Sequence, residues 1–197
     1  MTRVGALAVR TLVIKPLVKG AAAGLVGGLT ASWVMNRFQS MLSRLLENKE
    51  KPHGAQSIQE GSPTHGVGSE LKKRGIEDPE DDAAERTANF IAATAFDTEL
   101  SKNEKRHAGA AVHYAFGVVT GALYGAASEI WPRATVCAGL AFGAVVWLTA
   151  DEMAVPLLGL SRPAQDYPLS KHAYALTSHL VYGVTTEGIR KIVRGAM

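Results

Sequence analysis

Two long apolar segments between Thr135 and Ile192 carry ionisable side chains at positions that lipid would surround if the segments crossed a membrane. These side chains are Asp151, Glu152, His172, His179 and Glu187. Ionisable groups inside membrane spans are costly, so they usually face the interior of a helix bundle and are candidates for a functional site. The sequence therefore predicts an integral membrane helix bundle with a polar seam.

The overall composition hides this pattern, because 47% apolar and 20% charged residues are typical of a globular protein. Most of the charge lies between Arg44 and His107, and four stretches outside that block are dominated by Ala, Gly, Val and Leu. Roughly 20 residues at a rise of ~1.5 Å each cross the ~30 Å hydrocarbon core. We therefore predict an all-α fold, with one membrane domain over residues 1–197. Its four transmembrane helices are expected at about 17–41, 108–131, 134–158 and 170–190.

Residues 43–107 form the expected hydrophilic extramembrane loop. Its stretch 51–70 combines Gly, Pro, Ser and polar residues without periodicity, which indicates a flexible loop. Asp78, followed by Pro79 and three acidic residues, is typical of a helix start. Apolar residues then recur at three and four positions: Ala84, Ala88, Ile91 and Ala95. This spacing predicts a short amphipathic helix over about 79–95.

Basic residues in the short flanks of membrane spans indicate orientation. With four spans both termini share one side, and most flanking basic residues lie there: Arg3, Arg10, Lys15, Lys19, Arg133, Arg190, Lys191 and Arg194. Both termini are therefore expected to be cytoplasmic. These flanks also account for the net charge of +3, so we expect no nucleic-acid partner. The expected partners are the lipid bilayer and either a second copy of the chain or another membrane subunit.

Small residues recur at four-residue intervals in the spans, which lets helix backbones approach closely. The predicted packing glycines are Gly24, Gly28, Gly117, Gly121, Gly125, Gly139, Gly143 and Gly183. In the second span the row continues to His113 and Glu129, and in the third it ends at Asp151. The polar groups thus share helix faces with the packing residues. They are predicted to face other helices rather than lipid.

The predicted polar seam consists of His113, Glu129, Asp151, Glu152, His172, His179 and Glu187. If the spans alternate in direction, several of these residues fall at similar depths, with His179 close to the centre. Imidazole and carboxylate groups at one depth are competent metal ligands, and His113, Asp151 and His179 are the candidates. The same groups could relay protons or simply hydrogen-bond between helices. Because no ligand motif accompanies them, we expect no cofactor.

The second half of the chain contains a recognisable order of polar, glycine and proline residues: His113, Tyr124, Glu129, Pro132, Gly139, Leu140, Gly143, Ala144, Pro156, Gly159, Leu160, Pro163, Asp166, Pro168, His179, Leu180, Val181, Glu187 and Arg190. This order resembles the YagU-like family of bacterial inner-membrane proteins, a domain of unknown function. The resemblance covers most of residues 108–190 and continues at Gly20–Trp33, although the Pro-Pro-Arg expected after that span is missing. It implies a multispan inner-membrane protein without established chemistry. The resemblance also implies that family members carry a histidine where this chain has Asp151, and that His172 is not shared with the family.

Three functional hypotheses remain open. The preferred one is a nonenzymatic four-helix inner-membrane protein, structural or accessory, with a proton- or ion-linked role carried by His113, Asp151, His179 and Glu187. Its main alternative is a metal- or haem-binding membrane protein in electron transfer. A membrane hydrolase ranks third, because no nucleophile motif or positioned base accompanies Ser32, Ser128 or Ser178.

Overall fold

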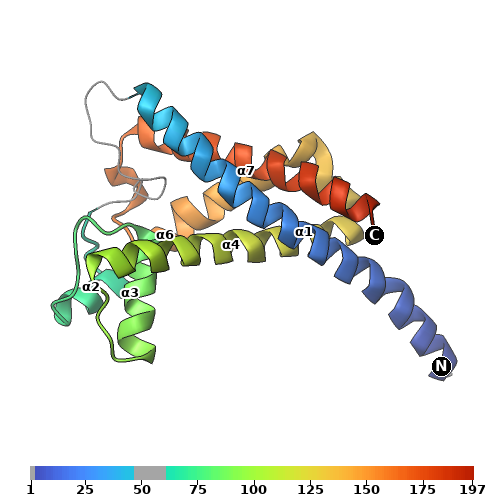
Figure 1. The fold of residues 1–197 in the computed structure, drawn as a ribbon, viewed down its shortest axis with the longest axis horizontal. Helices are drawn as coiled ribbons and strands as arrows, with labels where there is room; N and C mark the ends of the chain where they lie inside the picture. The colour runs from blue at the N-terminus through green and yellow to red at the C-terminus, as the bar shows by residue number, and fades with distance from the viewer. Residues whose placement is uncertain (1–2, 47–60) are drawn as a thin grey trace.

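The computed structural model describes residues 3–46 and 61–197, with side chains described from Ile14 to Arg44 and from Gly61 onward. Residues 51–60 of the predicted flexible loop lie outside this part of the chain. Every regular element within the described part is a helix, which confirms the all-α class (Figure 1).

Four long helical segments form the body of the molecule. They are α1 (Arg3–Leu46), α4 (Lys102–Ile130), a third segment (Pro132–Leu157) and α7 (Leu169–Gly195). The third segment is subdivided into η2 (Pro132–Gly139), α5 (Leu140–Val146), η3 (Trp147–Ala154) and α6 (Val155–Leu157). α1 crosses both α4 and α7, whereas α5 packs on α7 (Figure 1).

Three helical segments are long and apolar enough to cross a membrane, judged by length and composition. They are Ile14–Arg44, Lys102–Ile130 and Pro132–Leu157. α7 is not among them, and it carries Glu187, Arg190, Lys191 and Arg194 along its second half. Three of the four predicted spans are therefore helical segments that could cross a membrane, and the fourth span stays a prediction.

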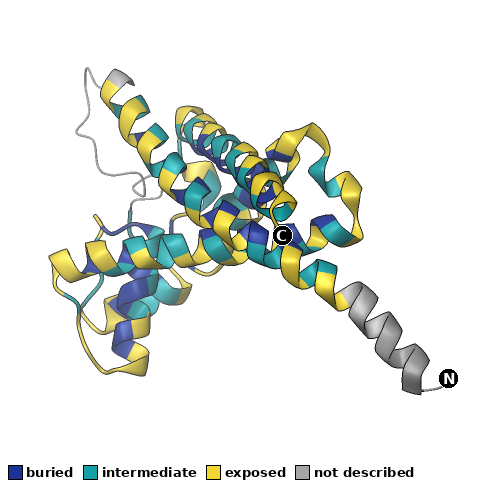
Figure 2. Cartoon of the chain, turned by 45° about the vertical axis from the view of Figure 1, so that its right-hand side comes forward, coloured by how far each residue is buried: buried dark blue, intermediate teal, exposed yellow. Residues whose placement is uncertain are grey.

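Large apolar side chains lie exposed on the outer faces of these segments. Leu29, Trp33, Leu123 and Leu148 are each about half exposed or more, at 47%, 52%, 65% and 48%. Buried positions occur where the long helices cross, and exposed positions cover much of the remaining surface (Figure 2). An apolar exterior around a close-packed interior is the arrangement that suits lipid as the surrounding solvent.

The third segment differs from the regular helix predicted over 134–158. Its backbone leaves helical geometry at Val136, and Cys137, Ala138 and Gly139 all have positive φ angles, of 61°, 52° and 88°. Regular helix begins only at Leu140, and η3 has the wider π-helical winding. The break places Gly139 directly against the carbonyl group of Gly183 in α7, where an added Cβ would clash. A contact between distant segments therefore determines this break, which local periodicity does not indicate.

The predicted packing glycines lie at helix contacts. Gly24 and Gly28 of α1 face Gly117, Gly121 and Gly125 of α4 so closely that a Cβ on any of the five would meet an atom of the facing helix at less than 3 Å. A second set of close contacts joins the third segment to α7: Gly139 with Gly183, and Gly143 with the carbonyl group of His179. Backbone-to-backbone packing thus holds α1 to α4 and α5 to α7.

The connection between α1 and α4 contains two helices, α2 (Gly66–Lys73) and α3 (Ala83–Ala95). The prediction of a flexible loop over 51–70 is wrong from Gly66 onward. The helix predicted over 79–95 starts later, because Asp82 rather than Asp78 caps it. The Asp82 carboxylate accepts hydrogen bonds from Ala84 and Glu85 N–H groups at 2.8 Å each.

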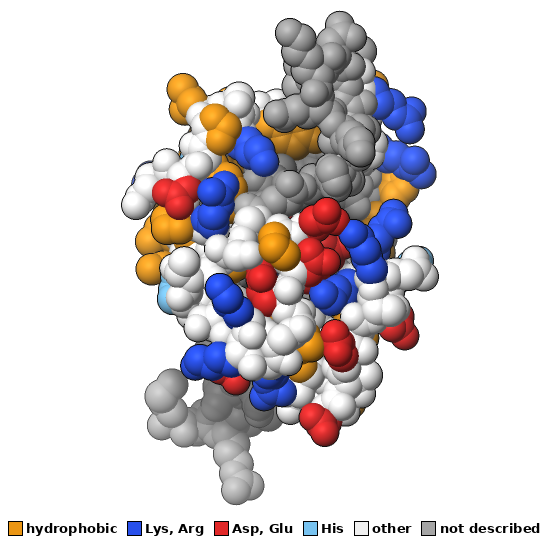
Figure 3. All heavy atoms as spheres, turned by 90° about the vertical axis from the view of Figure 1, so that its left-hand side faces the viewer, with side chains coloured by type: hydrophobic (Ala, Val, Ile, Leu, Met, Phe, Trp, Pro, Cys, Tyr) orange, Lys and Arg blue, Asp and Glu red, His pale blue; other side chains and the backbone are white. Residues whose placement is uncertain are grey.

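The buried face of α3 also differs from the predicted apolar stripe. Ile91 is 46% exposed, and the buried positions are Arg86, Ala88, Asn89, Ala92 and Ala93. Polar residues occupy this face because the backbone of neighbouring loops supplies their partners. Arg86 donates to the Leu160 carbonyl oxygen at 3.0 Å, which ties α3 to the loop that follows the third segment. Basic and acidic side chains are both spread over the surface at this end of the molecule (Figure 3).

Candidate functional site

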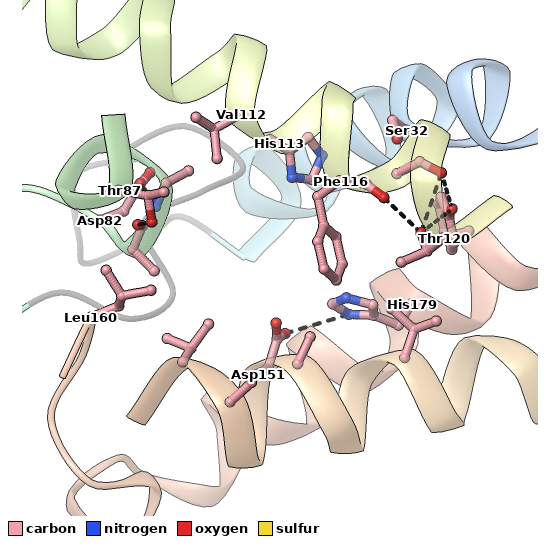
Figure 4. A pocket seen from close by; sticks show the side chains of 18 of the residues that line it. Ser32, Asp82, Thr87, Val112, His113, Phe116, Thr120, Asp151, Leu160 and His179 are labelled. Carbon is pink, nitrogen blue, oxygen red and sulfur yellow. Dashed lines mark hydrogen bonds and ion pairs between the residues drawn. The ribbon is translucent and has the colours of Figure 1, made fainter. Parts of the chain in front are cut away.

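A cavity of about 300 Å³ lies between α1, α4, the third segment and α7, and the start of α3 closes one end of it. Its wall is largely apolar, with Met35, Phe116, Val146, Leu158 and Tyr182 among the lining residues. α4 contributes one side, the third segment the opposite side, and α7 the space between them (Figure 4). An apolar pocket with a few convergent polar groups is the usual form of a small-molecule site.

The cavity brings Asp151 and His179 together. Asp151 comes from η3 and His179 from α7, and the Asp151 Oδ2 atom lies 3.5 Å from His179 Nδ1 (Figure 4). The same Nδ1 atom lies 2.9 Å from the carbonyl oxygen of Ala175, one turn earlier in α7. Because a carbonyl only accepts, Nδ1 carries a hydrogen in this arrangement. His179 is 8% exposed and the Asp151 side chain is 22% exposed, so the histidine is buried and the carboxylate partly buried.

His113 enters the same cavity from α4, on the side opposite Asp151 (Figure 4). Its Nε2 atom is buried and makes no hydrogen bond to any described residue. Gln39 of α1 also lines the cavity, is only 1% exposed, and has neither of its amide atoms hydrogen-bonded within the described residues. Buried polar atoms without partners are rare, because each costs about 1–3 kcal/mol.

The remaining residues of the predicted seam lie elsewhere. His172 Nδ1 lies 2.7 Å from Glu152 Oε1 beside a small cavity of about 20 Å³, which Asp151 also borders. Glu129 accepts from Arg194 at 2.7 and 3.1 Å. These members of the predicted polar seam therefore lie in separate polar clusters, in which each side chain has a partner of its own.

Glu187 forms the most deeply buried of these clusters. Its carboxylate, 1% exposed, accepts two hydrogen bonds from Arg190, at 2.7 and 2.9 Å. The Tyr124 hydroxyl donates a third at 2.9 Å, which joins α4 to α7. Lys191 lies 3.2 Å from the same carboxylate. These contacts assign Glu187 to interhelix bonding, away from the cavity.

The metal-ligand hypothesis finds no cluster to support it in the described part of the chain. No group of three or more His, Cys, Asp or Glu side chains comes together there in a way that could hold a metal ion. His113, Asp151 and His179 share the cavity, and Asp151 and His179 lie 3.5 Å apart within it.

A match to a protein family covers residues 73–188, which include α3, α4, the third segment and most of α7. The matching family is DUF1440, which is described as a protein of unknown function. The chain belongs to the DUF1440 family. The residues that carry the Asp151–His179 pair and His113 lie inside the matched region, whereas Gln39 lies outside it.

A curated relative supports the same placement of this DUF1440 member. The inner membrane protein YagU of Escherichia coli K12 is 30% identical over 82 residues, which are 42% of this chain and 40% of YagU. The matched part thus spans less than half of the length of that relative. No solved structure matches the chain. The predicted YagU-like membership is confirmed, and the apolar helices together with this relative identify a membrane protein.

Several polar residues of this DUF1440 member were not foreseen as site residues. Asp82 and Gln39 both line the cavity. Burial raises the pKa of the Asp82 carboxyl to about 7, although the hydrogen bond from the Glu85 N–H opposes this shift. Gln39 follows Ser32 by seven residues, so the two share a helix face, and this spacing was the available signal. Asp82 precedes Arg86 and Asn89 by four and seven residues, and this helical spacing was the available signal that the three polar residues share one helix face.

Proposed function

We propose that this DUF1440 member is a nonenzymatic inner-membrane bundle of four spans, with both termini cytoplasmic, that binds a proton at the Asp151–His179 pair. The observation that carries the proposal is the position of this pair: two ionisable groups from different helices meet beside a largely apolar cavity. Ionisable groups at such depth are costly and are retained mainly where they function.

The chemistry of the pair suits a proton-linked role. A carboxylate beside a neutral imidazole carries one net negative charge, and one added proton cancels it. Burying a net charge costs several kcal/mol more than burying a neutral pair, so the pair has a strong electrostatic reason to hold that proton. Because Asp151 lies on the third segment and His179 on α7, a change in protonation alters the contact between two helices.

Other observations favour this role over the alternatives. The hydroxyl groups of Ser32, Ser128 and Ser178 each donate to a carbonyl oxygen four residues earlier in their own helix. This bonding pattern supports a nonenzymatic role, because each hydroxyl hydrogen goes to a backbone carbonyl oxygen and not to a catalytic base. The metal- or haem-binding alternative has no described ligand cluster behind it, so we develop the proton-linked role alone.

A tryptophan reporter tests proton binding directly. Trp147 precedes Asp151 by four residues on the same helix, whereas Trp33 and Trp131 are 52% and 61% exposed. In a Trp33→Phe, Trp131→Phe background in nanodiscs, Trp147 fluorescence should titrate with pH. Asp151→Asn should remove that titration, His179→Gln should shift its midpoint, and His107→Gln, on the exposed start of α4, should leave it unchanged. A titration that survives Asp151→Asn would show that the proton binds elsewhere.

A further inference from the structure

The cavity contains unpartnered polar groups that take no part in the Asp151–His179 pair. Within the described residues, Gln39 has an unpaired amide nitrogen and an unpaired amide oxygen, and His113 has an unpaired Nε2 atom. Both side chains line the same cavity, one from α1 and one from α4. The Gln39 side chain is almost fully buried, so water at the outer surface does not satisfy it.

From this geometry we infer that the cavity binds a small neutral amphipathic molecule, whose polar head meets Gln39 and His113 and whose apolar body lies against the cavity wall. The inference goes beyond the proton-linked role, because neither anchoring residue belongs to the titrating pair.

The hydrogen-bonding capacity of the anchors defines the head group. The Gln39 amide offers two N–H donors and one carbonyl acceptor, so its ligand must supply both an acceptor and a donor. The Nε2 atom of His113 adds one more donor or acceptor, depending on the tautomer. Carboxamide and hydroxyl groups meet this requirement without carrying charge.

The charges around the cavity argue for a neutral head. Asp82 and Asp151 are the acidic residues that line it, and neither lysine nor arginine is among its described lining residues. An anionic head would therefore enter a site without a counter-charge. A cationic head has less to gain, because Asp151 already faces His179 and Asp82 already caps α3.

The wall and the volume define the body of the ligand. Phe116, Val146 and Leu158 give an apolar surface. A cavity of about 300 Å³ is at the lower end of the range known for ligand pockets, so the body is a short alkyl chain or a compact ring. Such a molecule partitions into the bilayer and can reach the cavity from there.

Radiolabelled n-decanamide in nanodiscs tests the inference, with protein-free nanodiscs and excess unlabelled ligand defining non-saturable uptake. The wild type should bind decanamide saturably, and n-decane, decanoate and decylamine should compete weakly. Gln39→Leu should weaken binding about tenfold, the factor expected for one lost hydrogen bond to a buried ligand. Gln165→Leu, at an exposed glutamine outside the cavity, should bind like the wild type.

Thermal unfolding of the same variants separates a ligand site from a structural role. Replacing an unpaired buried amide by an apolar side chain with one heavy atom fewer should leave the stability of Gln39→Leu equal to or above that of the wild type. A less stable Gln39→Leu would mean that the amide supports the fold, and would overturn the inference. So would the absence of saturable decanamide binding, equal binding by Gln39→Leu, equally strong competition by decane, or tighter binding of either charged analogue. None of these results depends on the pH titration of Trp147 fluorescence, so the ligand site and the proton-linked role are tested separately.

Discussion

Replacing Gly121 by leucine should prevent α1 from packing on α4 and reduce the yield of folded protein far below that of the wild type. A Cβ at this position would lie 2.5 Å from the Gly24 carbonyl oxygen and 2.7 Å from the Gly28 Cα. Both are backbone atoms, so no side-chain rotation relieves the clash and the helices must separate. The cost should exceed the ~1–3 kcal/mol typical of overpacking in a core.

Leu123→Ala is the matched control, because Leu123 lies two residues away in the same helix and is 65% exposed. Size-exclusion chromatography in detergent and thermal unfolding measure both variants. Similar yields and melting temperatures for Gly121→Leu and Leu123→Ala would contradict the proposed backbone contact between α1 and α4.

The second large effect is expected at Glu187, where substitution by leucine should lower the free energy of unfolding by about 3–5 kcal/mol, the range for breaking a buried ion pair. The substitution removes the acceptor for Tyr124 and for both hydrogen bonds from Arg190, which is 7% exposed. The Arg190 guanidinium would then remain buried without its carboxylate.

Glu129→Leu provides the comparison, because Glu129 also accepts two hydrogen bonds from an arginine. Its partner Arg194 has a side chain 30% exposed and can turn to water, so the loss should be about 1 kcal/mol or less. Thermal or denaturant unfolding in one detergent compares the two variants. Equal destabilisation would mean that the deeper burial of the Glu187 cluster does not determine how much it contributes to the free energy of unfolding.

The helical fold and its close contacts could be predicted from the sequence, because apolar length and small-residue spacing are local properties. Gly24 and Gly28 were expected to pack, and they lie against α4. Ser40 continues the four-residue spacing of Gly24 and Gly28, but it is exposed. A four-residue step turns an α-helix about 40° beyond one full turn, so a long row rotates away from its contact. Among the described side chains of α1 beyond Ser32, those of Met35 and Gln39 are buried.

The candidate site was harder to predict, because pairing between distant helices decides it. Sequence reasoning assigned His113, Asp151 and His179 to one interior region, and all three line the cavity. It also assigned Glu129 and Glu187 to the same seam, although nearby arginines hold both in separate clusters. Gln39 was missed because its signal, a spacing of seven residues from Ser32, indicates a shared helix face but no particular chemistry. The break before Leu140 was missed because a contact with α7 determines it.

The central claim is that Asp151, paired with His179, takes up a proton inside the bundle. Infrared difference spectroscopy of the protein in nanodiscs, recorded between high and low pH, measures this most directly, because a protonated carboxyl has its own C=O stretching band. We expect a carboxyl band that appears on acidification in the wild type and is lost in Asp151→Asn. In His179→Gln the band should shift, since the partner of the carboxyl has changed. A difference spectrum in which every carboxyl band of the wild type persists unchanged in Asp151→Asn would contradict the claim.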